Sequence, residues 1–176
     1  MPACPTIETE RLVLRPLGEG DLDRYFAIHT APDVRASLHK PDSYSPDDAW
    51  TEMALMRGQW ALRNSGQWAV ELRDTGELIG RAGTHRPQRA DWPGLECGWT
   101  FDPAHWGRGY ATEAGRATVE WAFANHDDDH LYSVILPTNR PSQAVAKRLG
   151  FTLLEERTLA FFPSAPHGIW VLPRPQ

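Results

Sequence analysis

The pattern of hydrophobic and polar positions predicts an alternation of short strands and amphipathic helices. Polar and apolar residues alternate from Glu10 to Leu17 and the run breaks at Pro16, which is typical of a half-buried strand. Helical spacing follows, beginning at Asp21, whose carboxylate is placed to cap the first turn. Pro32 and Asp33 are predicted to end this first helix.

The next segment contains a well-marked helix start and a hairpin. Ser45 is an N-cap candidate followed by Pro46, so a helix is predicted from there to about Arg63. Two strand-like runs, 68–73 and 78–84, flank a turn whose glycine suits a tight connection. A third antiparallel partner is expected over 95–101.

The second half of the chain adds two helices and three strands. The predicted elements are a helix over 111–125, a polar loop over 126–130, a strand over 131–136, a helix opened by Asn139 and ended by Gly150, and strands over 152–158 and 169–172. This order predicts an α+β fold around a mixed sheet.

Size and charge limit the classes of function. With 176 residues the chain fits one domain, and 18 Lys and Arg against 23 Asp and Glu give a net charge of −5. An acidic chain without a basic stripe disfavours binding to nucleic acid or to an anionic membrane. The eight tryptophans are a high count for this length, so some are expected to line a pocket.

Cysteine content and chain ends point to a soluble protein that is not exported. Cys4 and Cys97 are too few for a disulfide framework or a cysteine-based zinc site. The N-terminus lacks a signal peptide, and no window resembles a membrane span. A cytoplasmic location is therefore expected. The run from His126 to His130 contains metal-ligand types, but it is interpreted as a polar loop, and no metal is expected.

A strand, a glycine-containing turn and a helix follow one another from Trp99 to Ala114. Small residues at 107, 109 and 111 would let the backbone approach a bulky anion, and the helix start would direct amides at the same place. The run lacks the lysine of a P-loop and the third glycine of a dinucleotide fingerprint. A phosphate or pyrophosphate site is predicted; the alternative is that Gly107 and Gly109 only turn the chain.

Three motifs in order resemble the GNAT superfamily of N-acetyltransferases. Gly109 and Ala111 match the end of its acetyl-CoA loop, and the run from Trp106 to Ala114 resembles the RimJ/RimL branch, the ribosomal-protein N-terminal acetyltransferases. The other two motifs are the opening run 9–15 and the helix from Asn139 that ends in Leu-Gly-Phe at 149–151. The resemblance covers one domain, about 9–172, and implies a mostly antiparallel mixed sheet of about seven strands, splayed in the middle and flanked by about four helices.

The resemblance also implies where acetyl-CoA would lie. Pantetheine would occupy the opening between the strand that ends at Phe101 and the strand near 131, bonded to the backbone of Trp99, Thr100 and Phe101. The pyrophosphate would lie on the amides of the loop, Gly107, Arg108, Gly109, Tyr110, Ala111 and Thr112, and Trp106 would belong to the same cofactor site. Arg108 would add charge or remain a solvated arginine, and Asn139 would contact the cofactor or simply cap its helix.

The chemistry implied is attack of a neutral amine on a thioester, so a proton must leave the amine. Glu96 resembles the family's catalytic base; the alternative is a strand carboxylate paired with a neighbour. The usual tyrosine acid is replaced by Ala146, and Ser142 is the substitute candidate, unless it only occupies the first turn of its helix. No covalent route is expected, because Cys97 is predicted to be a buried, inert thiol.

The acceptor is an amine, either a small molecule or a protein N-terminus. Candidate pocket residues are Tyr44, Trp50, His85, Phe161 and Phe162, although a helix tryptophan is commonly core and a loop histidine commonly solvated. The competing function is a non-catalytic acyl-CoA sensor or scaffold; a nucleic-acid-binding module is a distant third. A monomer or homodimer is expected.

Overall fold

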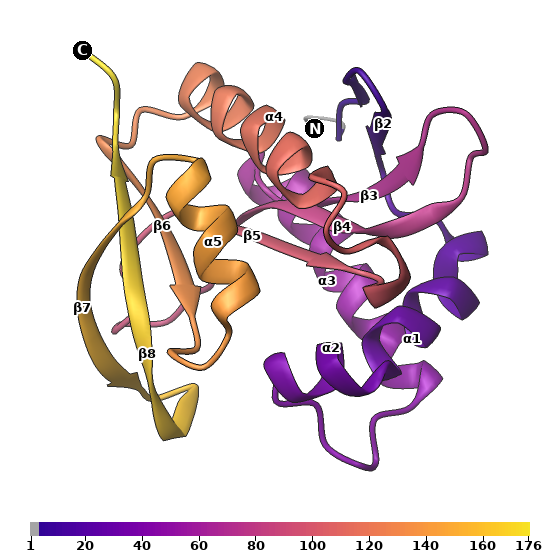
Figure 1. The fold of residues 1–176 in the computed structure, drawn as a ribbon, viewed down its shortest axis with the longest axis horizontal. Helices are drawn as coiled ribbons and strands as arrows, with labels where there is room; N and C mark the ends of the chain where they lie inside the picture. Colours follow the sequence, from indigo (N-terminus) through magenta and orange to yellow (C-terminus); the bar gives the residue numbers. More distant parts are fainter. Residues whose placement is uncertain (1–3) are drawn as a thin grey trace.

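The computed structural model describes residues 4–176. Its strands form one mixed sheet in the order β1-β2-β3-β4-β5-β6-β8-β7 (Figure 1). The strands are β1 (Ile7–Glu8), β2 (Leu12–Arg15), β3 (Gln67–Leu72), β4 (Leu78–His85), β5 (Glu96–Phe101), β6 (His130–Ile135), β7 (Thr152–Leu159) and β8 (Phe162–Pro173). The α-helices are α1 (Leu22–Thr30), α2 (Pro32–Ser37), α3 (Pro46–Arg63), α4 (Tyr110–Asn125) and α5 (Arg140–Arg148).

The sheet opens between β5 and β6, as predicted. These strands run parallel and share one register pair within the described chain, Glu96 with Tyr132, where the Tyr132 amide donates to the Leu95 carbonyl at 2.9 Å. Beyond that point they diverge, and α5 lies beside the opening (Figure 1). All other neighbouring strands are antiparallel. The backbone of β5 past residue 96 is therefore available to a ligand.

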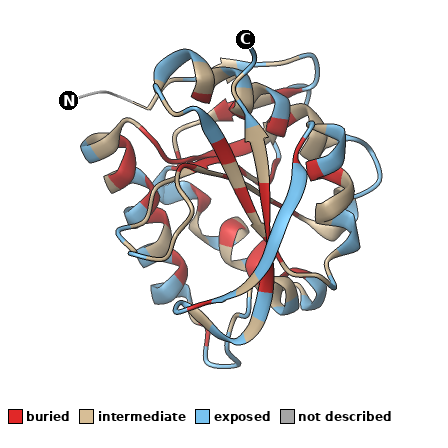
Figure 2. Ribbon diagram, turned by 90° about the vertical axis from the view of Figure 1, so that its left-hand side faces the viewer, coloured by how far each residue is buried: buried red, intermediate tan, exposed pale blue. Residues whose placement is uncertain are grey.

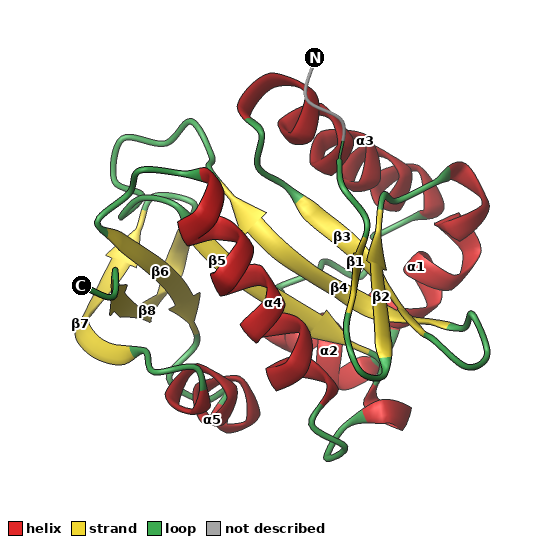
Figure 3. Ribbon diagram, turned by 90° about the horizontal axis from the view of Figure 1, so that it is seen from above, coloured by secondary structure: helices red, strands yellow, loops and turns green. Residues whose placement is uncertain are grey.

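Helices cover both faces of the sheet. Helix α4 crosses β4 and β5 on one face, while α1 and α3 lie on the other (Figure 3). Helix α3 begins where the sequence predicts, because Ser45 and Asp48 form a capping box and Pro46 occupies the first turn. It ends at Asn64, whose φ of 47° is left-handed.

Buried residues gather along the central strands (Figure 2). The end of α3 delivers Trp60 to a cluster with Trp68 of β3 and Trp121 of α4, and the ring centres lie 4.6–5.3 Å apart. Large rings in tilted and edge contacts give dense packing between the layers. A second core around Phe151 and Leu131 joins α4 and α5 to the strands beyond the opening.

Several element boundaries differ from the sequence prediction. Pro32 does not simply end α1; it starts the short helix α2, where a proline at the first position is well tolerated. The two-residue strand β1 adds an eighth strand, and α2 adds a fifth α-helix, to the elements expected. His130 belongs to β6 rather than to the preceding loop, and β8 starts at Phe162 rather than near 169 because it pairs with β7 over its length.

Candidate active site

The loop before α4 presents unpaired backbone amides. Gly107 and Gly109 have φ of 75° and 82°, and Gly109 is the N-cap of α4 with no side-chain cap. The first intrahelical bond is from Glu113 N to Gly109 O at 3.0 Å. Tyr110, Ala111 and Thr112 therefore keep free N–H groups, none of which donates to another residue in the described part of the chain. Free amides at the positive end of a 16-residue helix favour an anion.

The opening strand segment fixes this loop. Glu113 accepts hydrogen bonds from Thr9 Oγ1 at 2.7 Å, from Arg11 N at 2.8 Å and from Arg11 Nε at 2.7 Å. Arg11 also donates to the Arg108 carbonyl at 2.9 Å and lies 4.7 Å from the Tyr110 ring centre. Burial alone would raise the pKa of Glu113, but these hydrogen bonds and the arginine charge hold it below its usual value.

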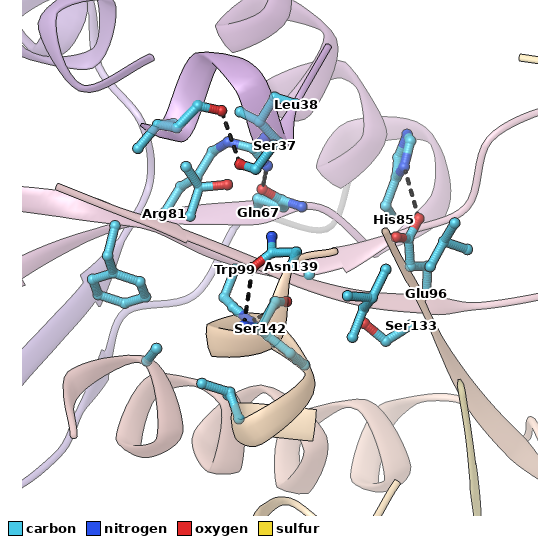
Figure 4. A pocket seen from close by; sticks show the side chains of 18 of the residues that line it. Ser37, Leu38, Gln67, Arg81, His85, Glu96, Trp99, Ser133, Asn139 and Ser142 are labelled. Carbon is cyan, nitrogen blue, oxygen red and sulfur yellow. Dashed lines mark hydrogen bonds and ion pairs between the residues drawn. The ribbon is translucent and has the colours of Figure 1, made fainter. Parts of the chain in front are cut away.

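The opening in the sheet is bridged by side chains of β5 and α5. The Trp99 indole N–H donates to Ser142 Oγ at 3.1 Å (Figure 4). Asn139 Oδ1 accepts from Ser142 N at 3.1 Å, so Asn139 is the N-cap of α5. The Ser142 hydroxyl hydrogen remains free to donate toward the cleft, because Trp99 uses only an oxygen lone pair. Ala146 is fully buried beneath this point.

The backbone of β5 alternates between its two neighbours. Asp102 N donates to Ile79 O at 2.9 Å, which fixes the antiparallel phase and directs the amide and carbonyl of Thr100 toward β4. Trp99 and Phe101 consequently direct theirs toward the opening. The Phe101 carbonyl accepts from Trp106 Nε1 at 2.8 Å, which holds the Trp106 ring beside the loop although it stays 42% exposed. Trp99 therefore offers its amide and carbonyl to the opening, and Phe101 offers its amide alone.

The other face of β4 and β5 forms the floor of an acceptor chamber. Two cross-strand pairs line it, His85 with Glu96 and Arg81 with Thr100, and Gly98 lies between Glu96 and Thr100 on the same face of β5. The Gln67 side-chain amide lies over Gly98, because a Cβ on Gly98 would meet Gln67 Nε2 at 3.1 Å. The chamber and the cofactor loop belong to one continuous cleft of 2320 Å³.

Glu96 and His85 lie together at one end of this floor. His85 Nδ1 is 3.6 Å from Glu96 Oε2, and both side chains are 14% exposed (Figure 4). Glu96 is paired with a neighbouring side chain, as one interpretation of the sequence expected, and that neighbour is His85, itself a candidate pocket residue. His85 is therefore not a solvated loop histidine. A carboxylate and an imidazole in contact form a pair that can accept and pass a proton.

Aromatic rings form the chamber wall above Glu96. Phe161 and Phe162 meet at 4.8 Å between ring centres, and Phe162 stacks on His167 at 4.4 Å. Trp92 contacts both phenylalanines, at 6.4 and 6.2 Å. Burial lowers the pKa of His167, so its ring is neutral and acts as part of an apolar wall.

The opposite wall comes from α2, α3 and the segment between them. Tyr44 lines the cleft with its hydroxyl donating to Glu52 Oε2 at 3.0 Å, and burial raises its pKa to about 12. Lys40 forms an ion pair with Glu52. This part of the wall is therefore internally neutralised.

The prediction that Trp50 lines the acceptor pocket is wrong. Its side chain is 50% exposed on α3 and does not line the cleft, since the helix turns Met53 and Met56 toward the core instead. Arg108 is also outside the cleft lining; its side chain is exposed and only its carbonyl is engaged, by Arg11.

The remaining sequence candidates concern cysteine, metal and membrane. Cys97 is fully buried, and burial raises the pKa of its thiol, which does not suit a nucleophile. Within residues 4–176 no group of three or more His, Cys, Asp or Glu side chains is arranged to hold a metal. None of the helices there is long and apolar enough to cross a bilayer.

The geometry fits acetyl-CoA. The free amides around Gly109 suit a pyrophosphate, and nothing lies within 4 Å of where a Gly107 Cβ would be, so the loop surface is open. The exposed edge of β5 at Trp99 suits an extended amide-bearing chain. Together they define a protein that binds an acyl-CoA across a split sheet and presents it to a second chamber.

Comparison with known proteins identifies the class. The model of the acetyltransferase (GNAT) domain matches residues 11–152, and the chain belongs to this family. It is a GNAT N-acetyltransferase that uses acetyl-CoA as its donor.

Individual relatives agree with this family. An acetyltransferase structure from Agrobacterium tumefaciens str. C58 is 34% identical, covering 98% of this chain and 96% of that one, with a TM-score of 0.83. The Bacillus subtilis N-acetyltransferase YoaA is 27% identical over 151 residues, 84% of this chain and 82% of its own. A ribosomal-protein-S5-alanine acetyltransferase from Vibrio fischeri shares the fold at 18% identity, covering 96% of each chain, with a TM-score of 0.74.

Sequence reasoning missed several residues that the fold brings to the chamber. Arg81, Arg89, Trp92 and His167 all line the cleft, yet none lies in a recognisable motif. The tryptophan count was the one available signal for Trp92. Strand alternation from Glu96 would also place Gly98 and Thr100 on its face, and their β4 partners only follow once the register is known.

Proposed function

We propose that this acetyltransferase acts on primary α-amines by direct attack in a ternary complex, with Glu96 as the base. The observation that supports this most is the register that places the Glu96–His85 pair on the chamber side of β5, while Trp99 and Ser142 meet at the opening. The amine would approach from the chamber, and the thioester would lie along β5 between the two groups.

A residue of the cleft is assigned to each of the three steps: proton removal, stabilisation of the oxyanion and release of the thiolate. Glu96, directly or through a water, accepts the proton as the amine nitrogen attacks the thioester carbonyl. A backbone N–H at Trp99 stabilises the oxyanion of the tetrahedral intermediate. The C–S bond breaks, and the Ser142 hydroxyl donates a hydrogen bond to the leaving thiolate. A thiol with a pKa of about 8.5 is a fair leaving group, so Ser142 has a modest part.

The preference for α-amines follows from proton affinity. An α-amino group has a pKa near 8 and a lysine amine near 10.4, a gap worth roughly 3 kcal/mol in deprotonation. The walls around Glu96 are mostly aromatic and offer little acidic help to a more basic amine. The chain's resemblance to the RimJ/RimL branch, carried by Trp106 to Ala114, supports the same substrate type.

A competition assay tests the proposal. A peptide with one α-amine and one lysine should be acetylated chiefly at the α-amine at pH 7, as read by mass spectrometry. Glu96→Gln should lower kcat by about 10²-fold or more and remove the acidic limb of the pH–rate profile. Glu156→Gln, an exposed carboxylate on β7, is the matched control and should leave both unchanged.

Two results would contradict it. A clear preference for the lysine or for a polyamine would withdraw the substrate assignment, and an unchanged Glu96→Gln profile would withdraw the base. Acetyl-CoA binding without thiol release from any amine would favour the sensor function instead.

A further inference from the structure

Arg89 is a chamber residue whose charge has no protein partner. It lies in the segment between β4 and β5 and lines the cleft. Its guanidinium carbon is 3.4 Å from the Phe161 ring centre and 4.8 Å from that of Trp92. Its backbone carbonyl accepts from the Trp92 amide at 3.2 Å, but its guanidinium makes no hydrogen bond or ion pair with any other residue in 4–176.

The other cations of the chamber are engaged. Arg81 donates to His29 Nε2 at 2.9 Å and to Gln67, and Lys40 is paired with Glu52. On the segment of Arg89 itself, Asp91 accepts from the Ala160 amide at 2.6 Å instead. Of these three chamber cations, Arg89 is the one whose donors are left for a ligand. Arg116 and Arg148 also line the continuous cleft without a partner in 4–176, but they belong to α4 and α5, the helices beside the cofactor loop and the opening.

Stacking orients these donors. A guanidinium lying against an aromatic face keeps its N–H groups in its own plane, at its edge. In that arrangement it matches the two oxygens of a carboxylate.

Arg89 lies near the base. The Trp92 ring links the two groups: its centre is 4.8 Å from the Arg89 guanidinium carbon and 6.4 Å from the ring centre of His85, whose Nδ1 is 3.6 Å from Glu96 Oε2. Burial lowers the pKa of Arg89, and the negative charges of Glu96 and Asp91 partly offset this. One carboxylate for the amine proton and one free guanidinium thus lie at the same end of the chamber.

We infer that the acceptor carries a carboxylate close to its α-amine and that Arg89 binds this carboxylate while Glu96 faces the amine. This inference rests on the proposed function. The acceptor class that follows is an amino acid or a peptide with an acidic group near its N-terminus. A polycationic amine would bring its second charge against Arg89 and is disfavoured.

Matched acceptors test the inference. Ala-Asp-Ala, Ala-Asn-Ala and Ala-Lys-Ala, all amidated at the C-terminus, differ in one side chain. Ala-Ala as free acid and as amide tests a terminal carboxylate in place of an acidic side chain. Two ratios of kcat/KM are compared: Ala-Asp-Ala over Ala-Asn-Ala, and Ala-Ala free acid over its amide. We expect the carboxylate-bearing acceptor to be favoured by at least about tenfold in one of these two ratios. In Arg89→Gln that ratio should fall to within about twofold, and Arg89→Lys should keep part of it.

Arg57→Gln is the control, because Arg57 is an exposed arginine of α3 that does not line the cleft. Its variant should keep the parent's ratio. No carboxylate preference in the parent, a preference for the lysine peptide, or the same ratio in Arg89→Gln would each overturn the inference. A loss of acetyl-CoA affinity in Arg89→Gln, with the carboxylate preference in kcat/KM unchanged, would also overturn the inference and would assign Arg89 to cofactor binding.

The peptide assays distinguish failure of carboxylate recognition by Arg89 from failure of α-amine acetylation. If the parent acetylates α-amines without regard to charge, the inference alone is wrong. If no α-amine is acetylated, the proposed function and the inference are both wrong.

Discussion

Replacing Gly109 with alanine isolates the contribution of one backbone conformation to cofactor binding. Gly109 is the N-cap of α4 with φ of 82° and ψ of 2°. A Cβ there would meet Arg11 Nη2 at 3.4 Å, which is close to ordinary contact, so crowding is slight. The effect should come from the left-handed backbone itself.

The size of the effect can be worked out from this geometry. A left-handed alanine costs roughly 1–2 kcal/mol relative to glycine, which lowers the Tm of a chain this long by about 2–8 °C. Rotating the backbone to relieve the strain would misdirect an amide from the pyrophosphate. A lost charge-assisted hydrogen bond of about 1.5–3 kcal/mol predicts about 10- to 150-fold weaker acetyl-CoA binding.

Gly76→Ala provides the matched control. Gly76 has φ of 69° with nothing within 4 Å of its Cβ position, and it lies in the β3–β4 turn away from the cleft. Both variants should lose similar stability in thermal melts, and only Gly109→Ala should lose affinity by calorimetry. Equal acetyl-CoA affinity in the two folded variants would refute the assignment of the loop. Gly109→Glu, which adds a negative charge, should bind more weakly still.

Three further outcomes are expected. Ser142→Ala should lower kcat by more than twofold with acetyl-CoA affinity little changed; rates within about twofold in stopped-flow or steady-state assays would mean that the thiolate leaves unaided. His29 is 1% exposed and burial holds its pKa well below 6.5, so below that pH the unfolded chain binds the extra proton. The Tm should therefore fall by about 2–4 °C between pH 6.5 and 5.5, because this one group destabilises the fold by about 1 kcal/mol over that range, and a flat or rising Tm would contradict this. Trp50→Ala should leave kcat/KM unchanged and stability within about 0.5 kcal/mol, which activity assays and melts can check, since its ring is exposed outside the cleft.

The local elements could be predicted from the sequence because their signals are local. Ser45 and Asp48 cap α3 within one turn, and Asn139 caps α5 in the same way. The Gly107–Gly109 turn and the helix after it lie in one continuous run, so the cofactor loop could be located without knowing the fold. Hydrophobic periodicity placed the central strands for the same reason.

The chamber depended on the tertiary structure, because its parts come from distant segments. Trp99 meets Ser142 across 43 positions of sequence, and Glu96 meets His85 through strand register. Arg89 becomes a binding candidate only when the turn between β7 and β8 brings Phe161 against it. Likewise, helical spacing alone cannot separate Trp50 from Trp60; the packing of α3 against β3 and α4 buries Trp60 and leaves Trp50 in solvent.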